Sequence, residues 1–465
     1  MNMRSVLSPF LLVTLVLTGL AVGGCRKAFL SKLPSTDLVV PSTLSDFQAL
    51  LDNDAVMSGT PVLGELSADN FYLPYTFWET LDTREQNAYV WAKDIYQGQG
   101  LVDDWDIPYK QVFYANVVLE GLSGITVDNT NRQQWQNEEG SALFLRAYAF
   151  FNLAQLFAPV YDSLTAGTDP GIPLRLHSDI TTPSIRASVK DTYTQILSDL
   201  QQASALLPAG VPAANRNRPS KPAALAMLAR VYLSMRAYSL AGLYADSCLQ
   251  LYSTLIDYNT VSPQAYLPFT RLNPEAIYQS SFLTYTHVLA ALAFPSCIID
   301  SNLYRSYAPN DLRSSIFYLI NTNGQPNMKG GYSGTIYPFS GLAADEVYLV
   351  RAECAARQGD TTRALQDLNT LLKNRWLQGT FTPVTAASPA AVLDTILAER
   401  RKELAFRGLR WTDLRRLNME GRNITLIRLL NGANFQLNPR SLNYVLPIPP
   451  DVLAYNPKMN QNPRQ

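Results

Sequence analysis

Hydrophobic residues recur at helical spacing between Gly341 and Trp376. The first half of this segment places one stripe on a single helix face: Ala344, Tyr348, Ala352 and Ala355. Gly359 suits the left-handed residue that ends a helix, and Asp360 suits the N-cap of the next one. The second half continues with Ala364, Leu368, Leu371 and Leu372. The pattern predicts an antiparallel helical hairpin.

A second segment, Lys221 to Tyr252, repeats this pattern. It places large, small and aromatic residues at the same offsets: Leu225, Ala229, Tyr232, Ala241, Ala245 and Cys248. Such a recurrence is typical of tetratricopeptide (TPR) helix pairs, although Ala-rich helices can also match by chance. Helical periodicity is also present over residues 103–122, from Glu138 to about Phe157, over 191–207 and from Val392 onward. We therefore predict a mostly α-helical scaffold of paired helices.

Other stretches lack a helical stripe. Residues 57–100 and 257–340 mix aromatic side chains with Asp, Asn, Ser and Pro, which predicts loop-rich structure. A short helix is expected before the first of them, with Thr43 or Ser45 as its N-cap. The Pro- and Asn-dense tail from Asn443 is predicted to be irregular or extended.

The N-terminus has the pattern of a targeting segment. Arg4 precedes an interrupted apolar run from Val6 to Val22, which favours a signal peptide over a membrane-spanning helix. Cys25 follows two glycines, as in a bacterial lipobox. We predict that residues 1–24 are removed and that Cys25 is lipidated, so that acyl chains hold the protein on a membrane. The alternative is an ordinary secretory signal with an incidental cysteine.

Composition narrows the class of protein. The 465 residues are 47% hydrophobic, enough for a large core, and include 25 Tyr and 29 Pro. Lys+Arg and Asp+Glu both number 38, which argues against a nucleic-acid partner. Beyond Cys25 the cysteines are Cys248, Cys297 and Cys354, and three cannot all pair, so a disulfide framework is not expected.

The sequence offers little catalytic chemistry. His177 and His287 are the only histidines, and no phosphate loop, HExxH or CxxC motif occurs. The carboxylate pairs Asp103-Asp104 and Glu138-Glu139 lie at predicted helix starts, where capping is the simpler role. The arginine-rich segment 398–416 is either an anion site or, as we favour, a network of ion pairs. We predict a protein that is not an enzyme and needs no cofactor or metal.

Several stretches together resemble the SusD/RagB family of glycan-binding outer-membrane lipoproteins of Bacteroidetes. NDLR at Asn310–Arg313 is similar to an Asp-x-Arg of the family's middle region. The other matching features are the lipobox at Cys25 and the segments FLSKLPSTD, LFLRAYAFFNLAQLFAPV, AERRKELAFRGLRWTDLRR and YVLPIPPDVLAYNPKMNQNP. The resemblance implies one SusD-like domain over residues 25–465. It would combine about four TPR-like helix pairs (about 101–256 and 341–418) with a loop-rich ligand-binding half (about 57–100 and 257–340).

The resemblance also implies a function and a partner. A protein of this family would be lipid-anchored in the outer membrane, on the cell surface, and would deliver oligosaccharide or polysaccharide to a SusC-like TonB-dependent transporter. Arg26 and Lys27 stand where an acidic export signal is associated with surface display, which leaves the surface and periplasmic faces both open. The competing functions are a TPR-type envelope scaffold that binds a protein, peptide rather than glycan capture, and a helical-barrel glycosidase.

Carbohydrate recognition needs flat aromatic faces together with planar polar groups for the hydroxyls. The N-terminal loop region offers Asp69, Asn70, Tyr72, Trp78, Trp91 and Tyr96. The middle insertion offers Tyr285, Tyr304 and Arg305. Any single aromatic residue of this set could instead pack the loop-rich lobe. We expect at least two of them to form a binding platform.

Overall fold

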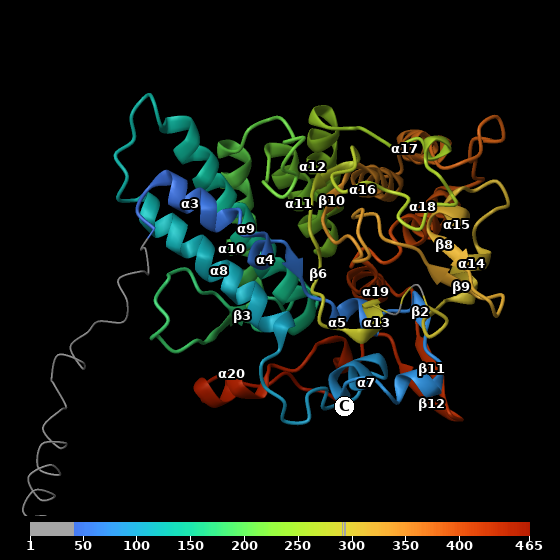
Figure 1. The fold of residues 1–465 in the computed structure, drawn as a ribbon, viewed down its shortest axis with the longest axis horizontal. Helices are drawn as coiled ribbons and strands as arrows, with labels where there is room; N and C mark the ends of the chain where they lie inside the picture. Colours follow the sequence, from blue (N-terminus) through green and yellow to red (C-terminus); the bar gives the residue numbers. More distant parts are fainter. Residues whose placement is uncertain (1–40, 291, 293) are drawn as a thin grey trace, which may run out of the picture. The chain divides into compact units, whose positions relative to one another are not determined.

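Helices that pack in chain order form most of the structure. The computed structural model describes residues 41–290, 292 and 294–465 (Figure 1). Each long helix lies against the next in this series: α8 (Asp103–Leu122), α9 (Arg132–Phe157), α10 (Val189–Leu206), α11 (Lys221–Ser234), α12 (Tyr238–Leu251), α16 (Ala344–Arg357), α17 (Thr361–Lys373) and α18 (Pro389–Glu403). The predicted mostly α fold built on helix pairs is confirmed. These helices belong to one unit, Thr43–Gln465; Cys25 and residues 1–24 lie in the other, Met1–Ser42, and outside the described residues.

The predicted hairpin corresponds to α16 and α17. Gly359 takes a left-handed φ of 85°, and the Asp360 side chain accepts a hydrogen bond from the backbone N–H of Arg363. Ala352 and Ala364 are fully buried where the two helices meet. Both helix ends therefore follow from local sequence.

The α11–α12 pair repeats this geometry with different residues. Arg236 takes the place of Gly359 and adopts the same left-handed conformation, at φ 62°. The backbone N–H of Ala237 donates to Tyr232 O at 2.9 Å, as that of Asp360 donates to Ala355 O at 2.9 Å. Ala237 has no side chain that can cap α12. The internal repeat is thus structural as well as sequential.

Three predicted boundaries or segments differ from the structure. Helix α9 begins at Arg132 rather than Glu138, because its polar first turns carry no apolar stripe. Glu138 is consequently an interior helix residue and not a cap. The tail contains a short helix, α20 (Pro450–Tyr455), since proline is tolerated in a first helical turn. A hairpin of β11 (Leu426–Leu430) and β12 (Ala433–Leu437) was not expected, although its Asn431-Gly432 turn is a strong hairpin signal.

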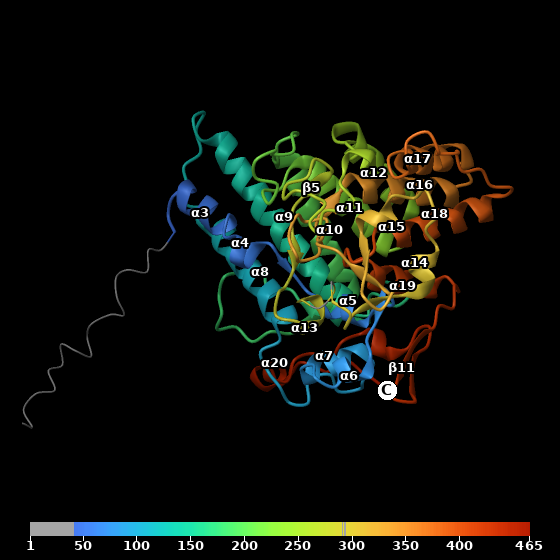
Figure 2. The same ribbon diagram turned by 45° about the vertical axis from the view of Figure 1, so that its right-hand side comes forward.

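Short elements fill the region between Thr43 and Tyr89. Thr43 caps the first helix in a capping box with Asp46, which confirms one of the two predicted N-caps. The elements are α3 (Leu44–Leu51), α4 (Asp54–Met57), β1 (Gly59–Thr60), α5 (Leu63–Ser67), β2 (Phe71–Tyr72), α6 (Tyr75–Trp78) and α7 (Thr83–Tyr89). Figure 2 shows α6 and α7 close to the β11–β12 hairpin.

Short elements also make up the middle of the chain and link it to the N-terminal region. They are β5 (Ala276–Tyr278), β6 (Ser281–Phe282), α13 (His287–Ala290), β7 (Ile298–Ile299), α14 (Ser301–Arg305), α15 (Arg313–Ile316), β8 (Tyr318–Ile320), β9 (Pro326–Met328) and β10 (Leu342–Ala343). Strand β1 pairs with β6 and β2 pairs with β7, so the two loop-rich stretches meet edge to edge. The remaining elements are β3 (Pro170–Pro173), β4 (Arg186–Ser188), α19 (Arg410–Met419) and two 3-10 turns, Tyr258–Thr260 and Leu442–Tyr444.

Candidate functional site

The pairing of β2 with β7 brings together candidate residues from distant parts of the sequence. Tyr72 lies opposite Ile298, and the backbone N–H of Asp300 donates to Asn70 O at 2.9 Å. Helix α14, which carries Tyr304 and Arg305, begins directly after β7. We call residues 69–78 and 298–305 the β2–β7 seam.

Aromatic side chains are offered to solvent along one side of this seam. Tyr72 is 37% exposed. Tyr75 and Trp78 are half-buried on α6, with ring centroids 5.8 Å apart and planes inclined by 33°. The indole N–H of Trp78 donates to Gln86 O at 3.1 Å, which holds that ring in place. Tyr75 was not among the predicted residues, although its spacing from Trp78 after Pro74 suggests a helical turn that pairs them.

Asp69 is held by arginines and is a positioning residue of the seam. Its carboxylate accepts two hydrogen bonds from Arg410, at 2.6 and 2.8 Å, and lies 3.2 Å from Arg401. Burial alone would raise the pKa of Asp69, but the Arg410 and Arg401 guanidiniums outweigh it and hold the pKa well below its usual range. Arg401 also lies 3.3 Å from Asp300, so one cation ties the two halves of the seam together.

Three predicted residues lie in the interior beneath the seam. The Asn70 amide donates to Glu65 Oε1 at 2.8 Å, and the Trp91 indole donates to Ser67 O at 2.9 Å. Tyr96 is also buried, and the Arg428 guanidinium from β11 lies 5.3 Å from the Trp91 ring. A ring packed on protein cannot stack on a sugar. We therefore do not carry these three residues into the proposed binding surface.

Tyr285 lies apart from the seam beside α5 and α8. Its hydroxyl donates to Asp104, whose other oxygen accepts from the backbone N–H groups of Val62 and Leu63 at 2.6 and 2.8 Å. Asp104 thus caps α5, rather than the start of its own helix. The Arg84 guanidinium lies 5.5 Å from the Tyr285 ring centroid. Tyr285 therefore supports a helix start and has no free hydroxyl for a ligand in this arrangement.

The arginine-rich segment forms buried ion pairs, as favoured above. The Asp-x-Arg of the middle region is part of them: Arg313 is fully buried and contacts Asp311 at 2.6 Å, Glu399 at 2.6 Å and Glu403 at 3.0 Å. Arg375 joins the same network through Glu403, at 2.7 Å. Further pairs continue it: Arg407 with Asp345, Arg400 with Asp413, and Arg416 with Glu353. The network fastens the middle region to the C-terminal helices.

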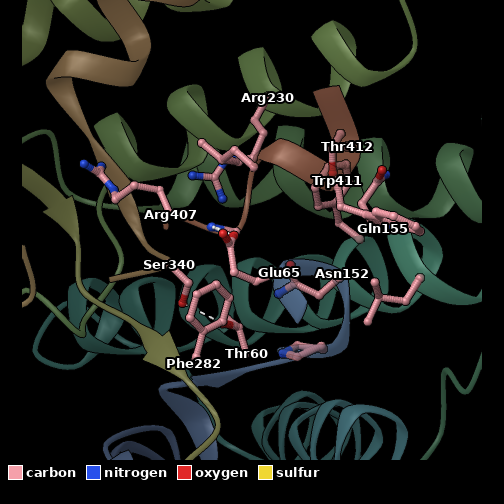
Figure 3. Close-up of a pocket in the computed structure, with 16 residues that line it drawn as sticks. Thr60, Glu65, Asn152, Gln155, Arg230, Phe282, Ser340, Arg407, Trp411 and Thr412 are labelled. Carbon is pink, nitrogen blue, oxygen red and sulfur yellow. Dashed lines mark hydrogen bonds between the residues drawn. The ribbon is translucent and has the colours of Figure 1, made fainter. Parts of the chain in front are cut away.

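A small polar cavity of about 40 Å³ lies where α5 meets α9, α11 and the turn before α19 (Figure 3). Glu65 lines it, accepts from the backbone N–H of Gly408 at 3.2 Å, and has its pKa raised to about 7 by burial. Asn152 Nδ2 and Trp411 Nε1 are buried donors without a protein partner in the described part of the chain. Ligand pockets measure roughly 300–1,000 Å³, so this volume suits water rather than a sugar.

The remaining chemical groups do not assemble into a reaction centre. His177 Nδ1 lies 3.2 Å from Glu120, and His287 Nδ1 lies 2.8 Å from Glu85. Burial raises the pKa of the three thiols at Cys248, Cys297 and Cys354. Within residues 41–290, 292 and 294–465, no cluster of His, Cys, Asp or Glu is arranged for a metal, and no helix has the length and apolarity to span a membrane.

Two family models match this chain. One, described as "Starch-binding associating with outer membrane" (SusD-like), covers residues 28–233, and the other, described as "SusD family", covers residues 342–464. No curated protein matches the chain.

Solved structures match over nearly the whole chain. A SusD superfamily protein from Bacteroides thetaiotaomicron is 23% identical, with a TM-score of 0.75, and the match covers 91% of this chain and 100% of that one. A SusD superfamily protein from Bacteroides vulgatus is 20% identical, with a TM-score of 0.74 and coverage of 91% and 99%. A structure described as a laminarin-binding SusD-like protein is 20% identical, with a TM-score of 0.63 and coverage of 90% and 97%.

At these identities the solved structures establish the fold, and the two family models establish the kinship. They match both the helix-rich N-terminal part and the C-terminal part with its arginine-rich segment. The resemblance inferred from the motifs is confirmed: this chain belongs to the SusD/RagB family.

Proposed function

We propose that this protein is a cell-envelope nutrient-binding lipoprotein. It captures an oligosaccharide or polysaccharide and delivers it to a SusC-like TonB-dependent transporter of the outer membrane. Family membership supports this role, and so does a solved relative described as laminarin-binding. The observation that carries the proposal is the exposed Tyr72 next to the Tyr75–Trp78 pair on the β2–β7 seam.

The side chains of the seam suit a sugar. Aromatic faces stack on the apolar side of a pyranose, and a guanidinium donates to its hydroxyls. Tyr72, Tyr75 and Trp78 offer the faces, and the exposed Arg305 with the half-buried Tyr304 offers donors across the strand pair. Asp69 orients Arg410 and Arg401 instead of meeting the ligand itself. Binding of this kind raises the local concentration of the ligand, and no bond is made or broken.

Calorimetric titration of the full-length protein in detergent, against a panel of polysaccharides, tests glycan capture. Removing Tyr72 or Trp78 by substitution with Ala should each cost about 1 kcal/mol, a loss of about fivefold in affinity. Tyr266→Ala is the matched control, because Tyr266 is also an exposed tyrosine, at 47%, and lies outside the seam. Unchanged affinity in both seam variants would remove these rings from the site.

Three rival functions have distinct outcomes. Peptide capture would give heat with oligopeptides and none with any polysaccharide. A TPR-type envelope scaffold would co-purify with an assembly machine and without a transporter. A glycosidase would release reducing sugar from a polysaccharide in the presence of the purified protein, and we expect none.

The location of the protein belongs to the same proposal. We place it in the outer membrane, anchored through acyl chains on Cys25 and exposed at the cell surface. Protease added to intact cells should then digest the protein. Resistance in intact cells, with digestion after lysis, would place it on the periplasmic face.

A further inference from the structure

A second hollow, of about 370 Å³, lies between α8, the loop of residues 173–184 and α20. We call it the α8–α20 groove. Figure 1 shows α20 near the ends of α8 and β3, whereas β2 lies near β11, so the groove and the β2–β7 seam are separate surfaces. Its volume falls within the roughly 300–1,000 Å³ typical of ligand pockets.

Hydrogen bonds fix the walls of the groove. The Tyr109 hydroxyl on α8 donates to Pro173 O at 2.9 Å, and the Asn116 amide donates to Arg175 O at 2.9 Å. On the other wall, Asn456 Oδ1 accepts from the backbone N–H of Ser184 at 2.7 Å. The loop is therefore bound to both α8 and the segment after α20. A groove with walls held in this way loses little conformational entropy when a ligand binds.

Aromatic rings supply flat apolar surface in the groove. The ring of Tyr109 is half-buried and packs on Trp105, with centroids 4.9 Å apart. Trp105 packs in turn on Phe157, at 4.9 Å, which backs the floor with a rigid ring. Phe113 and Tyr455 are exposed, Tyr455 by 83%. An exposed tyrosine beside a half-buried one offers two faces for a sugar ring.

Two carboxylates stand at one end of the groove. Asp451 accepts from the backbone N–H of Leu101 at 3.3 Å through one oxygen, and its other oxygen is buried without a partner in the described part of the chain. Asp106, one turn before the Tyr109 ring, is half-buried. Burial, followed by repulsion from Asp451 and Asp103, raises the pKa of Asp106 to about 6, against an opposing pull from Arg84.

The other charged groups at the groove are engaged by protein. The Arg175 guanidinium donates to Thr182 O at 2.7 Å and to Ser184 Oγ at 2.9 Å. Asp179 accepts from the backbone N–H of Thr181 at 2.8 Å, and His177 lies 3.2 Å from Glu120. Asp106 and Asp451 are thus the acceptors left for a ligand, and hydroxyl groups are donors that match them without a countercharge.

We propose that the α8–α20 groove is a second carbohydrate subsite for neutral sugars, with Asp106 and Asp451 accepting from hydroxyls and Tyr109 and Tyr455 contacting the ring faces. It rests on the proposed glycan capture for its ligand class. Two sites on one chain bind a polymer more tightly than a short oligosaccharide, because the second contact becomes intramolecular. The groove accordingly favours retention of long chains while the seam is occupied.

The test is the binding stoichiometry of the full-length protein in detergent, titrated with a neutral oligosaccharide of the polysaccharide found in the panel. The unaltered protein should bind two oligosaccharides per chain. Tyr455→Ala combined with Asp106→Asn should leave one, and Tyr72→Ala combined with Trp78→Ala should leave the other. Tyr266→Ala should retain both. Tyr455 is exposed and Asp106→Asn keeps the side-chain shape, so neither change should disturb folding.

Acidification distinguishes the two sites. In the seam double variant, whose remaining site is the groove, lowering the pH from 7.5 to 5 should weaken binding about tenfold, because Asp106 becomes protonated. Adding Asp106→Asn to that variant should weaken binding at pH 7.5 and abolish the pH effect. A stoichiometry of one that the groove variants do not change would overturn the second subsite and leave the seam intact. Absence of binding to every glycan would instead reject the proposed function. Binding of a Lys-rich peptide, but no sugar, by the seam double variant would assign the groove to a peptide.

Discussion

Replacement of Arg313 by methionine should destabilise the protein strongly. Arg313 is fully buried and contacts Asp311, Glu399 and Glu403, at 2.6, 2.6 and 3.0 Å. Methionine fills much of the space but leaves Asp311 and Glu403 buried with one cation fewer. Removing one partner of a buried ion pair costs about 3–5 kcal/mol, since the remaining charge is neither hydrated nor paired.

The magnitude can be read from thermal unfolding of the unit Thr43–Gln465 within the intact chain. Unfolding entropy is about 2.1 cal/mol/K per residue, so a loss of about 4 kcal/mol in a unit of this size lowers Tm by about 4 °C. Arg363→Met is the matched control. Arg363 pairs with Asp246 at the surface, and such pairs contribute about 0–1 kcal/mol.

The pH dependence of the Arg313→Met variant provides a sharper test. Without Arg313, the pKa values of Asp311 and Glu403 in the folded state should rise above their unfolded values. The folded state then binds more protons, so stability falls as pH rises between those values. The difference in Tm between the variant and the unaltered protein should therefore be larger at pH 8 than at pH 5. A Tm loss equal to that of Arg363→Met, or independent of pH, would refute a buried charge network.

Three further predictions concern the anchor, a helix cap and a buried carboxyl. Cys25→Ala should move the protein from the membrane fraction to the soluble fraction, whereas retention in the membrane would reject lipid anchoring through Cys25. Ala237→Asp should stabilise the protein by about 1 kcal/mol in urea unfolding, because it supplies α12 with the cap that Asp360 supplies to α17; no gain would show that Ala237 is too crowded. Burial raises the pKa of Glu65 to about 7 from an ordinary value of 4.5, so stability should fall as pH rises between those values, by up to about 3 kcal/mol in total. Glu65→Gln should flatten that dependence, and an unchanged slope would contradict the assignment.

Elements whose ends depend on neighbours in the chain were predictable. The helical stripe, Gly359 and Asp360 defined the α16–α17 hairpin, and the repeated offsets located α11 and α12. Helix α9 shows the limit of this reasoning. Its polar first turns pack through long-range contacts that periodicity does not register, and the carboxylates at Glu138 and Glu139 were consequently misplaced as caps.

The candidate site was predictable by region and by residue type, but not residue by residue. Trp78 and Trp91 have the same character in the sequence. Only the fold separates them, because the β11–β12 hairpin inserts Arg428 against Trp91 and leaves α6 at the surface. The α8–α20 groove could not be foreseen either, since its two walls come from opposite ends of the chain.

The sequence by itself determined the helix-pair architecture, the family and the aromatic character of the loop regions, because each rests on spacing or motif within a short stretch. Only the tertiary structure decided which aromatic rings face solvent, since burial depends on what packs over a residue. The pairing of β2 with β7 joins segments more than two hundred residues apart. Such a contact is set by the packing of the whole unit, and it determines where a ligand can bind.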